Sequence, residues 1–166
     1  MAYTELQVTT NFSFLRGASH PEELAEQAAA LGYTEIAITD RNSFAGIVRA
    51  HAAANQKGIR IIVGCRLDLL DGLSLLAYPT NVTAYSQMCN LLTTGNRRTE
   101  KGDCHLYKKD VYGCAGDIKF IILPPAELND LFDFDASFQQ ALQEYHTFFG
   151  DNLYIAASRR YQGARS

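Results

Sequence analysis

The residues best suited to chemistry lie where an expected strand meets an expected helix. The apolar run 36–38 is typical of a strand buried on both faces, and the polar side chains of Thr39 and Asp40 follow it. In barrels of alternating strands and helices, functional residues collect at the carboxyl ends of strands, so Asp40 and Arg41 are candidate site residues. The alternative is structural: Asp40 accepts backbone N–H bonds and holds the turn.

The elements expected around this junction alternate between strands and helices. Apolar runs predict strands at residues 6–9, 36–38, 60–64, 73–78, 120–123 and 153–157. Capping residues and apolar periodicity predict helices from Ser19 or His20 to Gly32, from about Phe44 to Gly58 with Asn42 or Ser43 as the cap, from Asn81 or Thr83 to Gly95, around 107–112, and at 137–148. A turn at 71–72 should pair the third and fourth strands as a hairpin. This alternation favours an α/β fold with a largely parallel sheet or barrel.

Composition narrows the class of protein. The chain has 166 residues, 47% of them apolar and 20% charged, which favours one soluble globular domain. A net charge of −3 gives no general attraction to nucleic acid. The N-terminus lacks a signal-peptide pattern, and no apolar run is long enough to span a membrane. The four cysteines are widely spaced, which favours reduced thiols and a cytoplasmic location.

Two segments carry distinctive charge. Residues 96–117 include Arg97, Arg98 and Lys101, which are candidate contacts for DNA phosphates, but interleaved acids favour a solvated connection instead. Residues 120–158 contain no Lys or Arg, and this stretch should repel nucleic acid. Its six acids are Glu127, Asp130, Asp133, Asp135, Glu144 and Asp151. The tail after residue 158 is basic. No dinucleotide-binding, P-loop, nucleophile-elbow or zinc-protease motif is present.

The stretches at the strand ends resemble the motifs of the PHP (polymerase and histidinol phosphatase) domain. Residues 7–17 resemble its first motif, 38–41 its second and 61–66 its third, while 153–156 is similar to a later strand that ends in an acid. More narrowly, residues 12–24, 39–43, 63–67 and 95–98 resemble the N-terminus of bacterial error-prone C-family DNA polymerases, relatives of the replicative alpha subunit. The resemblance implies a PHP-type distorted (β/α)7 barrel with largely parallel strands. Residues 1–166 would form its N-terminal portion, incomplete and without the polymerase core.

The resemblance also implies a metal pocket, from which this sequence departs systematically. The remnant pocket positions are Gln7, Thr9, Arg16, Asp40, Arg41, Arg66 and Ala156, and all except Asp40 replace a His or an acid of the family motif. Arginine cannot ligate a metal, since it stays protonated. We therefore expect that the metal-dependent phosphoesterase site is lost and that no cofactor is bound, although metal-competent relatives use divalent metal.

The three arginines suggest an inverted pocket. If Arg16, Arg41 and Arg66 converge, they should pair with Asp40 and Asp68, because a buried arginine requires such partners. An unpaired guanidinium could then hold an anion such as sulfate or phosphate. The alternative is that these arginines point into solvent.

Three functions follow from these observations and the resemblance. The leading hypothesis is a non-catalytic scaffold from an error-prone DNA polymerase, a nucleotidyltransferase of DNA replication and damage-induced repair synthesis. The alternatives are a residual metal-dependent phosphoesterase or exonuclease, and a DNA-binding module that uses Arg97, Arg98 and Lys101. Expected partners are the remainder of the polymerase chain, other mutagenesis or replication proteins, DNA through the parent polymerase, and a second copy through open barrel edges; no membrane partner is expected.

Overall fold

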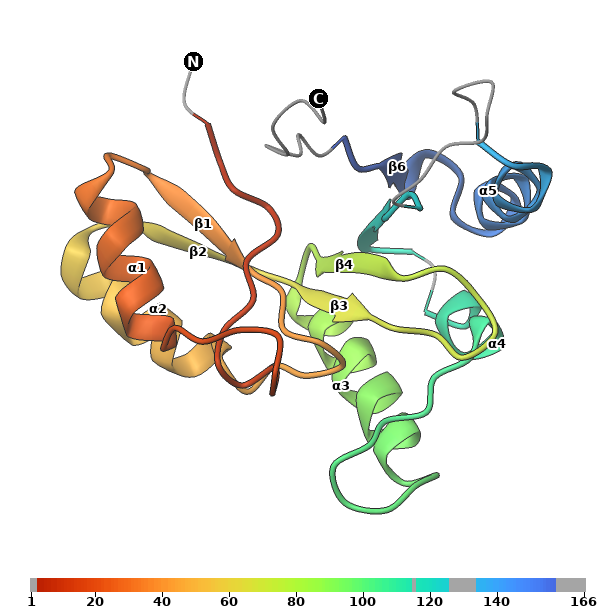
Figure 1. Cartoon of the computed structure of the whole chain (residues 1–166), viewed down its shortest axis with the longest axis horizontal. Coiled ribbons are helices and arrows are strands. Elements are labelled where there is room, and N and C mark those ends of the chain that lie inside the picture. Colours follow the sequence, from red (N-terminus) through yellow and green to blue (C-terminus); the bar gives the residue numbers. More distant parts are fainter. Residues whose placement is uncertain (1–2, 115, 126–133, 158–166) are drawn as a thin grey trace, which may run out of the picture.

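The computed structural model describes residues 3–114, 116–125 and 134–157 and has a mixed α/β architecture (Figure 1). Its strands are β1 Glu35–Ile38, β2 Arg60–Val63, β3 Cys65–Leu67, β4 Leu75–Pro79, β5 Ile118–Ile122 and β6 Leu153–Ile155. Its helices are α1 Pro21–Ala30, α2 Ile47–Lys57, α3 Val82–Asn96, α4 Lys108–Tyr112 and α5 Ala136–Phe149, with a 3-10 turn at Gly150–Asn152 before β6. The predicted α/β class is confirmed.

The strands form two sheets that share one bend. Strands β1 and β2 pair in parallel, and β3, β4, β5 and β6 follow in that order in the second sheet. A parallel bridge between Arg41 and Arg66 carries the first pairing past the bend at Gly64. Gly64 is required there, because a Cβ atom would lie 2.7 Å from the ring of Tyr78. The bend therefore brings the end of β1 beside the start of β3.

In the second sheet the first two strand pairings are antiparallel and the last is parallel. Strands β3 and β4 form the predicted antiparallel hairpin, and β5 pairs with β6 in parallel. Strands β4 and β5 are antiparallel, with Pro79 opposite Ile118. The alternation of elements gave no indication of this last pairing.

Helices cover the outer faces of both sheets. In Figure 1, α1 and α2 pack together against β1 and β2, where Ile38, Ala50 and Ala54 are fully buried. The larger core lies around α3, α4 and α5, with Phe120 and Tyr145 among its largest buried side chains. Within the described residues, no helix combines the length and apolar character needed to cross a bilayer.

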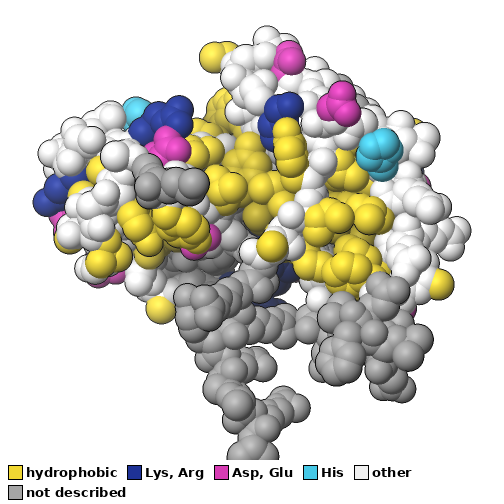
Figure 2. All heavy atoms as spheres, turned by 90° about the horizontal axis from the view of Figure 1, so that it is seen from above, with side chains coloured by type: hydrophobic (Ala, Val, Ile, Leu, Met, Phe, Trp, Pro, Cys, Tyr) yellow, Lys and Arg dark blue, Asp and Glu magenta, His cyan; other side chains and the backbone are white. Residues whose placement is uncertain are grey.

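The inner face of the sheets opens onto an apolar cleft of about 960 Å3. Residues 3–7 form one wall and residues 154–157 the other, with Ile62, Leu76 and Ile121 between them. Figure 2 shows hydrophobic side chains gathered in this hollow, between the α1–α2 lobe and the α5 lobe. The Tyr78 hydroxyl donates a 2.5 Å hydrogen bond to the Leu6 carbonyl, which ties residues 3–7 to β4. The described strands do not close a barrel on this side.

Several predicted boundaries are confirmed. Helix α1 begins after His20, whose N–H donates to Glu23 at 2.8 Å, and α2 ends at Gly58, which adopts a φ of 71°. Helix α3 is capped by Asn81, which accepts the Ala84 N–H at 2.8 Å.

Other boundaries are corrected. Residues 6–9 do not form the predicted strand and only run beside β1, where Thr39 N–H donates to the Val8 carbonyl at 2.7 Å. Helix α2 begins after Gly46, not after Asn42 or Ser43. The Asn42 side chain is unavailable for capping because it accepts the Asp68 N–H at 2.9 Å. Helix α3 continues through Gly95, where glycine is needed because a Cβ would lie 2.6 Å from Cys104 Sγ.

Candidate functional site at the strand ends

The carboxylate of Asp40 lies at the end of β1 and is 1% exposed. It accepts hydrogen bonds from the Thr10 N–H at 2.9 Å, from the Thr10 hydroxyl at 2.8 Å and from the Ser13 hydroxyl at 2.8 Å. The Ser13 hydroxyl in turn accepts the Arg41 N–H at 2.9 Å. Asp40 therefore fastens the loop 11–17 to the end of β1.

These contacts favour the structural role for Asp40 over a role in chemistry. Every hydrogen-bond donor that its carboxylate meets among the described residues belongs to Thr10 or Ser13, and these donors are neutral. The expected ion pair between Asp40 and an arginine is therefore wrong for the described part of the chain. Neutral hydroxyl and amide donors satisfy the buried carboxylate without a second buried charge, whose desolvation is costly.

Asp68, not Asp40, forms ion pairs with Arg41 and Arg66. Its two carboxylate oxygens lie 3.2 Å from Arg41 Nη1 and 2.8 Å from Arg66 Nε. Ser74 adds a 2.6 Å hydroxyl bond to the same carboxylate. Burial acts to raise the pKa of Asp68, but the hydrogen bonds from Ser74 and Arg66 and the charges of both arginines outweigh it, so the pKa lies below its ordinary value.

The remaining arginine, Arg16, lies near enough to Arg41 to influence its pKa. Burial lowers the pKa of Arg41, Asp68 acts against that change, and the positive charges of Arg66 and Arg16 lower it further. The charges of both Arg16 and Arg66 therefore act on Arg41, and the Asp68 carboxylate contacts Arg41 and Arg66. Arg16 is exposed and lines the same cleft as Arg41. Anion binding by these side chains stays a prediction.

A cleft of about 740 Å3 opens next to this cluster, and we call it the loop cleft. Three segments line it: residues 12–14 and 16 of the loop before α1, residues 41–43 after β1, and residues 96 and 100–104 at and after the end of α3. Figure 1 shows the red loop that precedes α1 and the green segment that follows α3 on the same lower side of the molecule. The cationic side chains are Arg16, Arg41 and Lys101, and Glu100 and Asp103 are the acids.

The seven remnant pocket positions do not share one cavity. Arg16 and Arg41 line the loop cleft, whereas Gln7 and Ala156 line the apolar cleft on the inner face. Arg66 lies with Asp68 and Ser74, and Thr9 is half-buried beside the end of β1.

The three residues predicted to contact DNA differ in their surroundings. Arg98 holds both oxygens of Asp110 at 2.5 and 2.8 Å and lies 5.5 Å from the Tyr107 ring centroid, so it fastens α3 to α4. Arg97 and Lys101 are exposed.

In the acidic stretch, Glu127, Asp130 and Asp133 lie outside the described residues, as does the basic tail after residue 157. Glu144 binds Lys108 at 2.7 Å.

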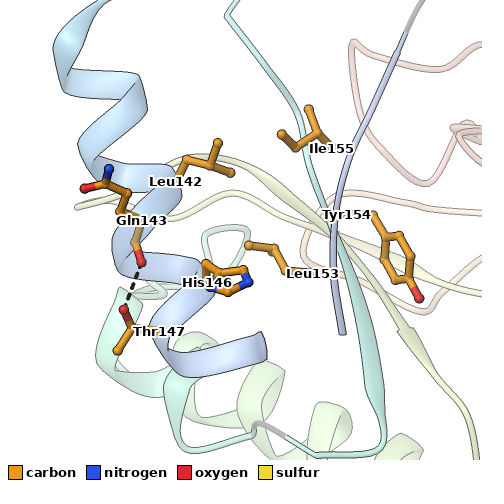
Figure 3. Close-up of a pocket in the computed structure, with 7 residues that line it drawn as sticks. All are labelled: Leu142, Gln143, His146, Thr147, Leu153, Tyr154 and Ile155. Carbon is orange, nitrogen blue, oxygen red and sulfur yellow. Dashed lines mark hydrogen bonds between the residues drawn. The ribbon is translucent and has the colours of Figure 1, made fainter. Parts of the chain in front are cut away.

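A shallow groove of about 550 Å3 separates α5 from β6 on the outer face. Figure 3 shows Leu142 and His146 of α5 facing Leu153 and Ile155 of β6, while Tyr154 points to the other side of the strand. The dashed bond is local to the helix, from the Thr147 hydroxyl to the Gln143 carbonyl. The residues that line this groove include no Asp, Glu, Lys or Arg.

Comparison with known proteins settles the family. Residues 5–160 match the model of the PHP domain. The chain belongs to the PHP domain family. It is 50% identical over 160 residues to an error-prone DNA polymerase of Caulobacter vibrioides, covering 96% of this chain and 14% of that protein. It is 46% identical over 160 residues to error-prone DNA polymerase 2 of Agrobacterium fabrum, with the same coverage.

Solved structures confirm the fold. An amidohydrolase from Chromobacterium violaceum, solved with bound sulfate and no metal, aligns with a TM-score of 0.66 at 16% identity, over 92% of this chain and 75% of that one. A putative metal-dependent phosphoesterase from Bifidobacterium adolescentis aligns with a TM-score of 0.60 at 13% identity, over 85% and 73% of the two chains. The fold is therefore that of a PHP domain, as the motifs predicted.

The remnant pocket positions of this PHP domain offer a divalent metal one carboxylate and no histidine. In the described part of the chain, no three His, Cys, Asp or Glu side chains are grouped to hold an ion. Asp40 is the one carboxylate among the remnant positions, and hydroxyl and amide donors already surround it. Arg41 and Arg66 add positive charge where a cation would need lone pairs.

Sequence reasoning missed the residues that surround the two acids. Thr10 and Ser13 hold Asp40, while Ser74 and Asn42 hold Asp68 and its backbone. Thr10 and Ser13 lie within the first motif stretch, so their position was a usable signal. For Ser74, no feature of the sequence indicated a partner.

Proposed function

We propose that this PHP domain is a non-catalytic structural module of an error-prone DNA polymerase, acting in DNA replication and damage-induced repair synthesis. The observation that carries the proposal is the state of Asp40, the one acid that the remnant pocket retains. Its oxygens are engaged by Thr10 and Ser13, and its role is to position a loop. The polymerase activity belongs to relatives that are much longer than this chain, which spans 14% of their length.

A residual phosphoesterase is the less favoured alternative. It would require Asp40 to exchange its hydroxyl and amide donors for a metal ion. It would also place that ion near Arg41, whose pKa is already lowered by burial and by two neighbouring arginines. As part of the proposal, the domain works in the cytoplasm, and its partners are the rest of the polymerase chain and other replication or mutagenesis proteins.

The experiment measures hydrolysis and metal binding together. The purified chain is incubated with bis-p-nitrophenyl phosphate and with single-stranded DNA in Mn²⁺, Zn²⁺ or Mg²⁺ across a pH series. Metal uptake is measured by calorimetry, and a metal-competent PHP phosphoesterase serves as the positive control. We expect neither metal-stimulated hydrolysis nor stoichiometric metal binding. Stimulated hydrolysis that disappears in Asp40→Asn would overturn the proposal.

A further inference from the structure

We propose that the loop cleft binds single-stranded DNA, with a base stacked on Phe14 at its rim and phosphates held by the cationic side chains of its walls. This site goes beyond the scaffold role and rests on the assignment to a DNA polymerase for the choice of DNA. It needs neither a metal nor a catalytic group. Its outcome is therefore independent of the hydrolysis experiment.

The rim presents an aromatic ring to solvent on a fixed loop. Phe14 is 84% exposed, and its neighbour Leu15 is equally exposed and adopts a φ of 60°, a conformation that is unusual for leucine. The loop is nevertheless held firmly, because Ser13 bonds to Asp40 and its carbonyl accepts the N–H groups of Arg16 and Gly17 at 2.9 and 3.1 Å. Because the backbone that carries the Phe14 ring is already ordered, stacking of a base on the ring costs less conformational entropy than it would on a disordered loop.

The loop 11–17 is tightly packed at Gly17, although Phe14 and Leu15 at its tip are exposed. A Cβ atom on Gly17 would lie 2.2 Å from the Thr10 carbonyl oxygen, so the loop closes on itself with no space to spare. Phe12, the second aromatic residue of the cleft, lies with its ring 5.8 Å from the guanidinium carbon of Arg49 on α2. The loop therefore acts as a rigid platform for Phe14.

The walls supply positive charge from three separate segments. Arg16 comes from the loop before α1, Arg41 from the end of β1, and Lys101 from the segment after α3. Arg41 is anchored to Asp68 at 3.2 Å yet keeps 32% of its side chain exposed. Glu100 and Asp103 share a wall with Lys101, so three cations face two acids. The excess is small, and we expect a dissociation constant on the order of 1–100 µM.

The repulsion among the arginines gives an anion a specific benefit here. Arg41 is flanked by Arg16 and Arg66, and the one carboxylate shared by Arg41 and Arg66 is that of Asp68. A phosphate oxygen between Arg16 and Arg41 would offset that repulsion. Asn42, Ser43 and Asn96 add polar side chains along the same cleft.

The combination of an exposed ring and spread cations favours a single strand over other anions. A free phosphate would use the arginines and leave Phe14 without a partner. A duplex hides the faces of its bases, so it also leaves the ring unused. Single strands combine backbone charge with free base faces, and proteins bind them through basic grooves that carry aromatic side chains. A volume of about 740 Å3 fits a ligand of nucleotide size.

The experiment is fluorescence anisotropy of a 5′-labelled oligothymidine of about twelve nucleotides, titrated with the whole chain at low salt. Phe14→Ala removes the stacking ring and should weaken binding by about fivefold or more. Its matched control is Leu15→Ala, an equally exposed neighbour outside the cleft, which should leave affinity unchanged. Arg16→Gln should weaken binding several-fold and reduce the salt dependence by about one unit of slope. Its charge-matched control is Lys57→Gln at the far end of α2.

Competition experiments distinguish single-stranded DNA from other phosphate-bearing ligands. Unlabelled oligothymidine should displace the probe at lower concentration than either pyrophosphate or a hairpin duplex. Equal displacement by pyrophosphate would overturn the proposal, and so would a loss of affinity shared equally by Phe14→Ala and Leu15→Ala. Absence of binding by the unmodified chain up to about 1 mM would also overturn it. All four substituted side chains are exposed, and thermal melting by circular dichroism verifies that each variant is folded.

Discussion

The hydroxyl of Ser13 donates a 2.8 Å hydrogen bond to the buried carboxylate of Asp40, 27 residues further along the chain. Because Asp40 is 1% exposed and its donors are neutral, the fold depends on this carboxylate as an acceptor. We expect Asp40→Ala to lower the free energy of unfolding by about 3 kcal/mol, since it leaves the Thr10 and Ser13 donors buried without an acceptor. Urea denaturation followed by circular dichroism measures this loss.

The control for that substitution is Asp103→Ala. Asp103 is exposed on the wall of the loop cleft, so its removal should change stability by less than about 0.5 kcal/mol. Equal losses in the two variants would show that Asp40 is not a structural acceptor.

The cluster around Asp68 predicts a dependence of stability on acid. The pKa of Asp68 is below its ordinary value of 3.8 in the folded chain, so the unfolded chain binds the proton more readily. The stabilisation is complete above that ordinary value and is lost as the pH falls toward the lower folded value. Asp68→Asn should therefore show a smaller fall in its urea midpoint between neutral pH and about pH 3. A fall as steep as that of the parent chain would exclude this role.

Replacing Gly95 by alanine should lower stability, whereas the same substitution inside a helix usually raises it. An alanine in place of an internal helical glycine commonly stabilises by up to about 1 kcal/mol. At Gly95, however, the new Cβ would lie 2.6 Å from Cys104 Sγ and 2.7 Å from a methyl group of Leu106. We expect Gly95→Ala to destabilise by about 1–3 kcal/mol through overpacking. The control is Gly113→Ala, where the nearest atom lies at 3.5 Å and φ is −68°, so thermal melting should show little change.

The sequence predicted those parts of the fold that depend on local signals. Helix caps such as His20 and Asn81, the hairpin of β3 with β4 and the short helix α4 all follow from neighbouring residues. The antiparallel pairing of β4 with β5 did not, because the segment after α3 returns the chain to the end of β4 from which it left. No local pattern records that return.

The candidate site divides in the same way. Motif spacing located Arg41 and Arg66 at adjacent strand ends, where Asp68 contacts both. The choice of partner for Asp40 was not predictable, since it depends on which side chains the loop 11–17 folds inward. A glycine at position 95 predicts a helix end, and only the position of Cys104 against the helix explains why glycine is needed there.

The apolar cleft on the inner face predicts self-association through the edge of β6, which pairs with β5 alone among the described strands. Ile155 is 48% exposed and lines both this cleft and the outer groove beside α5 (Figure 3). Exposed apolar surface beside an unpaired strand edge is a template for pairing with another chain. We expect the chain to sediment as a concentration-dependent mixture of monomers and larger species, and Ile155→Lys should shift it toward monomer. The matched control is Val48→Lys, which changes an even more exposed apolar residue on α2 and should leave the distribution unaltered. A chain that sediments as a monomer at every concentration tested would contradict the prediction, because the edge would then be protected without a partner.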